Sequence, residues 1–241
     1  MIGNIKGIYL ILLMMILFAC TGNGDSGAPN DDRWTKQREA MVETQIARRD
    51  VRDENVLRAM RTVPRHLFVP EKYRAESYRD GPLPIGNGQT ISQPYIVALM
   101  TEMLRVDSSS KVLEVGTGSG YQAAVLAEIV DSVFTVEIVE ELAKRSNRII
   151  DSLGYDNVIV RAGDGYMGWP EAAPFDAIIL TAAAPRIPEP LVDQLKPDGR
   201  MVIPIGEFSQ ELMLVTKSDT GMVKKAVIPV RFVPMTGEIR K

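Results

Sequence analysis

Cysteine and histidine are almost absent from this chain of 241 residues, which holds one of each, Cys20 and His66. A single cysteine excludes a disulfide within the chain, and a metal site built from cysteine and histidine is not expected. A side-chain nucleophile activated by histidine would have to use His66, which we expect to pack or cap locally. The scarcity therefore favours chemistry that needs no activated nucleophile.

A surplus of positive charge is also missing. The chain carries 28 Lys and Arg against 31 Asp and Glu, a net charge of -3. This balance gives neither the basic footprint of a nucleic-acid-binding protein nor a polybasic membrane patch. The apolar fraction of 45% and the length suit one large α/β domain. We expect a monomer without a nucleic-acid partner.

One long hydrophobic run, residues 8–18, lies near the N-terminus after Lys6. It is shorter than a membrane span and precedes a small residue, Ala19, so residues 1–20 are interpreted as a signal peptide. The Leu-Phe-Ala-Cys sequence ending at Cys20 resembles the bacterial lipoprotein signal, although Phe18 is larger than usual there. An uncleaved leader or a misassigned start codon is the alternative.

This interpretation makes Cys20 a lipid anchor and the protein a membrane-anchored lipoprotein or a periplasmic protein. Residues 21–32 are rich in Gly, Asn and Asp and predict a flexible tether. The folded domain is expected over residues 33–241.

Strands and helices are predicted to alternate from Lys111 onward, which indicates an α/β fold with a mostly parallel sheet covered on both faces. Residues 33–69 predict an N-terminal helical extension, with Asp53 as a helix N-cap. Residues 80–94, dense in Gly and Pro, predict an irregular loop, and residues 196–199 a turn before the next strand. Two apolar runs around residues 218–221 predict a C-terminal antiparallel hairpin.

The strongest motif is the strand-to-helix turn over residues 112–121, in which Glu114 precedes Gly116, Gly118 and Gly120. Glycines suit a tight turn whose backbone lies against a ligand. The dinucleotide fingerprint would need glycine at position 121, where the chain has Tyr121. An acid before a G-x-G-x-G turn is typical of methyltransferases, whose cofactor carries a sulfonium and an ammonium. A plain tight turn is the alternative.

Two further sites follow the next predicted strands. Glu137, about twenty residues beyond the glycine turn, is placed to accept hydrogen bonds from both ribose hydroxyls. Asp164, in the Gly-Asp-Gly sequence that ends at Gly165, is placed to accept from the exocyclic amine of adenine. The alternatives are a solvated carboxylate and an Asp-Gly turn. The carboxyl ends of parallel strands converge, so the three sites together favour cofactor binding.

Several segments resemble the protein-L-isoaspartate O-methyltransferase family. They are residues 63–70, 83–95, 112–124, 163–169, 175–185 and 231–236. The resemblance covers roughly residues 41–238. The glycine turn is common to many methyltransferases, whereas the Gln-Thr-Ile-Ser-Gln-Pro sequence at residues 89–94 is specific to this family.

The resemblance implies a Rossmann-like class I fold with a seven-stranded sheet and S-adenosylmethionine as cofactor. It implies methylation of the free α-carboxylate of L-isoaspartyl residues in damaged proteins. By residue matching, Ser92 takes the active-site position, and Glu137, Asp164, Gly165 and Thr236 contact the cofactor. A helix N-cap before Pro94 is the alternative for Ser92.

Three rival functions remain open at this point. A nicotinamide oxidoreductase conflicts with Tyr121, and a small-molecule methyltransferase is not expected to carry residues 89–94. A non-enzymatic lipoprotein that retains the fold is the third, because S-adenosylmethionine is made in the cytoplasm.

Overall fold

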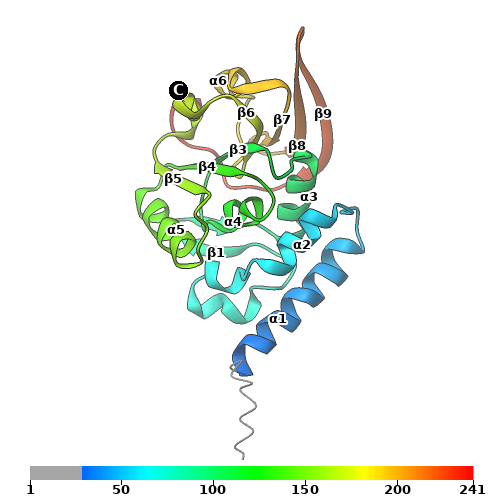
Figure 1. Cartoon of the computed structure of the whole chain (residues 1–241). Helices are drawn as coiled ribbons and strands as arrows, with labels where there is room; N and C mark the ends of the chain where they lie inside the picture. Colours follow the sequence, from blue (N-terminus) through cyan, green and yellow to red (C-terminus); the bar gives the residue numbers. More distant parts are fainter. Residues whose placement is uncertain (1–28, 241) are drawn as a thin grey trace, which may run out of the picture.

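The computed structural model describes residues 29–240, so the predicted signal peptide and Cys20 lie outside the described residues. Helix α1, Pro29–Met41, opens this part of the chain. The last four residues of the predicted tether are therefore helical, because proline is well tolerated in the first turn of a helix. In Figure 1, α1 begins at the end of the molecule opposite the tip of the hairpin formed by β8 (Gln210–Ser218) and β9 (Gly221–Val230).

A seven-stranded sheet forms the centre of the fold, in the order β5-β4-β3-β6-β7-β8-β9 (Figure 1). The five strands from β5 to β7 are parallel, and β8 and β9 are antiparallel. The strands are β3 Lys111–Val115, β4 Ser132–Glu137, β5 Val158–Ala162, β6 Phe175–Leu180, β7 Leu195–Ile205, β8 Gln210–Ser218 and β9 Gly221–Val230. The predicted class I methyltransferase fold is confirmed.

Helices cover both faces of the sheet because successive strand residues point to opposite faces. Val112 belongs to one buried cluster and Leu113 to another. The first cluster packs against α2 Glu54–Thr62, α3 Pro94–Leu104, α4 Tyr121–Ala127 and α5 Glu140–Ser152. The second packs against α6 Glu189–Asp193 and the C-terminal turn η6 Glu238–Arg240. The core thus lies in two layers, and the strand ends between them are free to form a site.

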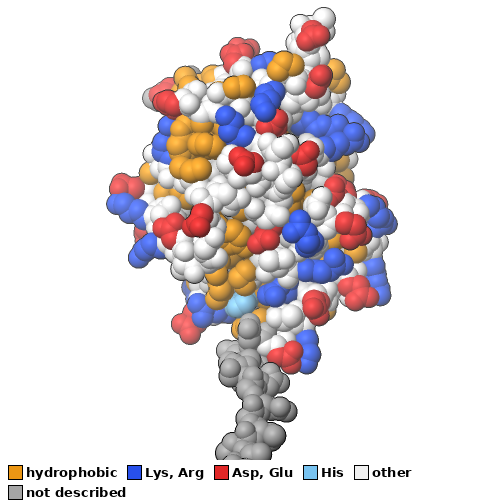
Figure 2. Space-filling model, in the orientation of Figure 1, with side chains coloured by type: hydrophobic (Ala, Val, Ile, Leu, Met, Phe, Trp, Pro, Cys, Tyr) orange, Lys and Arg blue, Asp and Glu red, His pale blue; other side chains and the backbone are white. Residues whose placement is uncertain are grey.

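The N-terminal helices follow the sequence prediction closely. The helical turn η1, Val42–Ala47, continues α1, and Asp53 caps α2 by accepting hydrogen bonds from the amides of Asn55 and Val56. None of the helices within residues 29–240 is both long and apolar enough to cross a membrane. On the face drawn in Figure 2, acidic and basic side chains are mixed.

The prediction of an irregular loop over residues 80–94 is wrong. Strands β1 Leu83–Gly86 and β2 Gln89–Ile91 form a two-stranded antiparallel hairpin. Asn87 and Gly88 form its turn with positive φ angles of 52° and 70°, which Asn-Gly adopts readily in hairpins. The density of proline and glycine hid this pairing.

The predicted turn at residues 196–199 lies inside β7, which begins at Leu195, and Asp198 within it has a positive φ of 60°. The pairing between β6 and β7 shifts between Phe175 and Ala177, so the strand absorbs the Pro-Asp-Gly sequence as an irregularity. Lys196 Nζ, 2.7 Å from Asp176 Oδ1, ties this part of the strand to β6. The local turn is therefore retained, and the pairing with β6 resumes at Arg200.

Candidate active site

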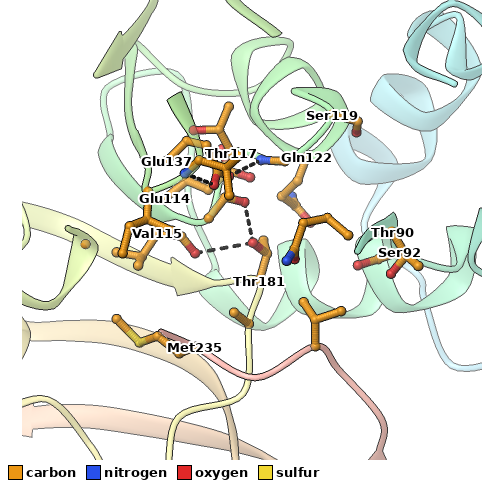
Figure 3. A pocket seen from close by; sticks show the side chains of 18 of the residues that line it. Thr90, Ser92, Glu114, Val115, Thr117, Ser119, Gln122, Glu137, Thr181 and Met235 are labelled. Atoms are coloured by element: carbon orange, nitrogen blue, oxygen red, sulfur yellow. Dashed lines mark hydrogen bonds between the residues drawn. The ribbon is translucent and has the colours of Figure 1, made fainter. Parts of the chain in front are cut away.

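A cavity lies at the carboxyl ends of β3, β4 and β6, where ligands bind in open α/β sheets. It encloses about 810 Å³ of space that includes open solvent, within the usual range of ligand clefts. Its walls come from residues 89–92, 114–119, 121–122 and 136–139, from Val97, Gly165, Thr181 and Ala182, and from residues 233–236. Of the sequence-predicted residues, Gly120 and Asp164 are not part of this lining, and the others border the cavity, whose labelled side chains Figure 3 shows.

The glycine turn forms the floor of the cavity. Gly116, Gly118 and Gly120 have φ angles of 101°, 53° and 87°, a region that side chains rarely allow. A Cβ at Gly116 would also overlap Thr181 Oγ1. That hydroxyl donates to the carbonyls of Val115 and Gly116, which holds the turn against β6 (Figure 3). The backbone can therefore approach a ligand closely.

Glu137 is held at the edge of the cavity by two backbone amides. Its Oε2 accepts from Gly118 N at 2.7 Å, and its Oε1 accepts from Val139 N at 2.9 Å. Each carboxylate oxygen can accept more than one hydrogen bond, so both can still receive hydroxyl donors from the cavity. The arrangement fits the predicted ribose contact.

Glu114 is fully buried beneath the turn. Its Oε2 accepts from Thr135 Oγ1 at 2.6 Å, while Oε1 has no partner within residues 29–240. Burial, with the charge of Glu137 as a smaller cause, raises the pKa of the Glu114 carboxyl to about 8. A buried carboxyl with an unused oxygen at the cavity wall suits a cationic ligand. Together with the glycine cradle, this donor set fits S-adenosylmethionine.

Gly165 and Asp164 have separate roles. Gly165 lines the cavity, and a Cβ there would overlap Val115 Cγ1. The carboxylate of Asp164 accepts from the amide of Tyr166 at 2.9 Å and from the amide of Glu238 at 2.7 Å. In this structure Asp164 caps a turn and holds the C-terminal segment, and its contact with the adenine amine stays a prediction.

Ser92 lies across the cavity from Glu137, directly after β2 (Figure 3). The helix N-cap of α3 is Gln93, and Ser92 Oγ has no hydrogen-bond partner within residues 29–240, so the capping alternative is wrong. The hydroxyl is available to a ligand. This is the geometry expected of a residue that orients a substrate.

Arg65 supports Ser92 from behind and was not singled out from the sequence. Its side chain is fully buried; Nη2 donates to Ser92 O at 2.7 Å, and Nε donates to Ser77 O at 2.7 Å. The guanidinium lies 4.8 Å from the ring centroid of Tyr121, the first residue of α4. Burial lowers the pKa of Arg65 to about 10, so it stays charged at neutral pH. Nothing in the sequence around Arg65 predicts this burial, because arginine side chains are usually exposed.

The C-terminal segment closes the remaining side. Met235 N donates to Ala183 O, and Ala183 N donates to Val233 O, both at 2.8 Å, which brings Thr236 to the cavity wall as predicted.

His66 lies outside the lining; its ring stacks on Trp34, with centroids 4.7 Å apart, and its Nδ1 lies 2.8 Å from the Tyr78 hydroxyl. Residues 29–240 contain no cluster of His, Cys, Asp and Glu that could hold a metal ion.

The strand order, the glycine turn and the two carboxylates define a class I S-adenosylmethionine-dependent methyltransferase. The family model for protein-L-isoaspartate(D-aspartate) O-methyltransferase matches residues 36–240, and the chain belongs to this family.

Relatives agree over nearly the full length. Protein-L-isoaspartate O-methyltransferase 2 of Shewanella sediminis is 52% identical over 97% of this chain and 95% of its own. The Opitutus terrae protein-L-isoaspartate O-methyltransferase is 54% identical over 95% of this chain and 97% of its own.

Solved structures of the family share the fold. One protein-L-isoaspartate O-methyltransferase has a TM-score of 0.76 at 30% identity and covers 85% of this chain and 67% of its own. A structure described as a putative protein-L-isoaspartate O-methyltransferase from Plasmodium falciparum, solved with S-adenosyl-L-homocysteine, has a TM-score of 0.72 at 29% identity. The match covers 83% of this chain and 98% of that chain.

Proposed function

We propose that the protein transfers a methyl group from S-adenosylmethionine to the free α-carboxylate of L-isoaspartyl residues in damaged proteins. The ester then recyclises to a succinimide with release of methanol, and hydrolysis reopens part of the succinimide as L-aspartate. Family membership over residues 36–240 supports this activity. The structural observation that carries it is that Ser92 and the glycine turn border one cavity.

The geometry suits a carboxylate nucleophile. An α-carboxylate, with a pKa near ~3.5, is ionised at neutral pH and needs no general base. S-adenosylmethionine, when bound, would supply a methyl group on a positively charged sulfur; the carboxylate oxygen would bond to the methyl carbon as the carbon–sulfur bond breaks and the neutral thioether leaves. Ser92 Oγ donates a hydrogen bond to the substrate carboxylate, and residues 233–236 line the cavity beside it. Proximity and orientation supply the rate increase.

One assay tests the activity. Methyl transfer from labelled S-adenosylmethionine is measured to a peptide with one isoaspartyl residue, with the matching aspartyl peptide as control. Labelling of the isoaspartyl peptide alone is the expected result. Labelling of neither peptide, or of both equally, would contradict the proposal and revive the rival functions.

The N-terminal sequence supports a second part of the proposal, export and lipid anchoring through Cys20, which makes the enzyme a membrane-anchored lipoprotein. The measurement is mass spectrometry of the mature N-terminus, with Cys20→Ser as the control that removes the lipid. A mature chain that begins at a lipidated Cys20 is expected. A chain that retains Met1, or is cleaved elsewhere, contradicts anchoring.

We further propose that the protein acts as a monomer, because one chain supplies every wall of the cavity. Light scattering during size-exclusion chromatography measures this directly. A single species with the mass of one chain is expected, and a stable dimer at working concentrations would be the contrary result.

A further inference from the structure

A second cavity opens beside the cofactor cavity. The two share Thr90, Ser92, Thr181 and Val233 in their linings. A third cavity continues from the second, since both are bordered by Arg231 and Phe232. A surface channel therefore leads from Ser92 past the end of β9 to the loop between β7 and β8.

Arg231 is the single charged residue in the lining of the second cavity. It is exposed, and its guanidinium has no hydrogen-bond or ion-pair partner among residues 29–240. The other cation along the channel, Arg240, is already engaged, with Nη1 3.3 Å from Glu207 Oε1. Arg231 is thus a cation in the channel that is open to an incoming anion.

Phe208 borders the far end of the channel. Its side chain is fully exposed, at 104% of the reference area, in the loop after β7. Gly206, with a φ of 126° and no room for a Cβ next to Ser209 O, sets the tight turn that carries it. Aromatic and arginine side chains are the residue types enriched in polypeptide interfaces. An exposed phenylalanine and an unpaired arginine on one channel therefore fit a polypeptide ligand.

We propose that this channel holds the stretch of substrate polypeptide on one side of the isoaspartyl residue. Arg231 pairs with an acidic side chain a few residues away, and Phe208 covers an apolar side chain beyond it. The inference rests on the proposed function. Continuity with Ser92 makes the substrate the occupant, because the polypeptide must extend in some direction from the site of methylation.

The test uses peptides that contain one isoaspartyl residue and differ in a single Glu or Gln, placed at each neighbouring position in turn. KM and kcat are measured for the natural chain, Arg231→Gln and Arg231→Glu. Lys224→Gln is the matched control, because Lys224 is an exposed residue of β9 that borders none of the three cavities. Both arginine variants alter an exposed side chain, and circular dichroism checks that they fold.

We expect KM to be about two- to fivefold lower for the Glu peptide at positions on one side, the range of an exposed ion pair. Lys224→Gln retains this preference, Arg231→Gln removes it, and Arg231→Glu reverses it. Phe208→Ser raises KM for a peptide with an apolar residue farther along that side, and not for its serine counterpart.

Equal KM values for Glu and Gln at every position, or a preference that survives in Arg231→Gln, would overturn the inference. So would dimerisation of the natural chain that Phe208→Ser abolishes, because the occupant would then be a second copy. Failure of the proposed function looks different: no isoaspartyl peptide, including the Gln series, would be methylated.

Discussion

The two halves of the cavity are built in different ways. The cofactor half comes from the ends of neighbouring parallel strands: Gly116 follows β3, Glu137 is the last residue of β4, and Gly165 follows β5. The acceptor half combines Ser92, Thr181 and Val233, which are far apart in the sequence. One half is a repeated local pattern that the sheet brings into register, whereas the other exists only after long-range packing.

The halves also differ in charge. The cofactor half contains two buried carboxylates, Glu114 and Glu137, whereas the acceptor half contains the Ser92 hydroxyl with the buried guanidinium of Arg65 behind it. A cationic cofactor is favoured beside the acids and an anionic substrate beside the hydroxyl and the cation. The division of charge orients the two reactants, so changes confined to one half should affect one reactant.

The largest effect is expected from Gly116→Ala, which breaks the cofactor half. The new Cβ would overlap Thr181 Oγ1 in a backbone region that disfavours side chains, and we expect binding of S-adenosylmethionine to fall below detection by calorimetry. Gly154→Ala is the control, because Gly154 has a similar φ of 77° with open space around it. It should lower the free energy of unfolding by about 1–2 kcal/mol and leave binding intact. Normal binding of S-adenosylmethionine by Gly116→Ala would refute the role of the glycine turn in holding the cofactor.

Ser92→Ala tests the acceptor half alone. Loss of a hydrogen bond to a charged substrate should lower kcat by about 10- to 100-fold. The dissociation constant for S-adenosylmethionine should stay nearly unchanged, and Ser152→Ala, on an exposed helix end, serves as the control. An equal loss of cofactor affinity and turnover would refute the role of Ser92 in orienting the substrate.

Glu137→Ala should weaken S-adenosylmethionine binding by about 10- to 50-fold, because the ribose loses its acceptor and the Gly118 amide loses its partner. Glu140→Ala, at the exposed start of α5, controls for the loss of one negative charge. Calorimetry measures both. Unchanged affinity in Glu137→Ala would refute the ribose assignment.

Arg65→Met should lower kcat by about tenfold, because the carbonyls of Ser77 and Ser92 lose their donor and the hairpin loses its support. Urea denaturation should show a loss of about 2–4 kcal/mol in the free energy of unfolding. Arg65→Lys should recover part of the turnover through one hydrogen bond. If cofactor affinity fell as much as kcat, the two halves would not be separable in this way.

The smallest effect is a pH dependence from Glu114. Its pKa of about 8 means that the carboxyl is mostly protonated at pH 7, and a cationic ligand favours the ionised form. S-adenosylmethionine affinity should therefore rise about fivefold from pH 7 to pH 8 and level off above pH 9. Binding at pH 7 should release protons, which calorimetry in buffers of different ionisation enthalpy detects. The same slope in Glu114→Gln would assign it to another group.

The cofactor half could be predicted from the sequence because each of its parts is local. A buried strand followed by alternating glycines dictates its own turn, and Glu137 and Gly165 occupy the predicted cavity wall. Asp164 shows the limit of this reasoning. Its neighbours specify a strand end, but the amide of Glu238, over seventy residues later, accounts for one of its hydrogen bonds.

The acceptor half was predicted in part, through residues 89–94 and their family resemblance. The sequence missed the hairpin that presents Ser92, because proline and glycine at residues 80–94 mask two short strands. It also missed Arg65, since an arginine is normally exposed and only the packed carbonyls of Ser77 and Ser92 explain its burial. Both errors concern contacts between segments that are distant in sequence.

The sequence by itself determined the fold class and the cofactor turn, because these depend on the local backbone preferences of glycine and on strand periodicity. It indicated Ser92 only through the family resemblance of residues 89–94. Only the tertiary structure decided that Ser92 has a free hydroxyl facing the glycine turn, that Arg65 supports it, and that Asp164 is turned to the C-terminal segment. The physical reason is that buried polar groups must find hydrogen-bond partners, and the partners are chosen by packing.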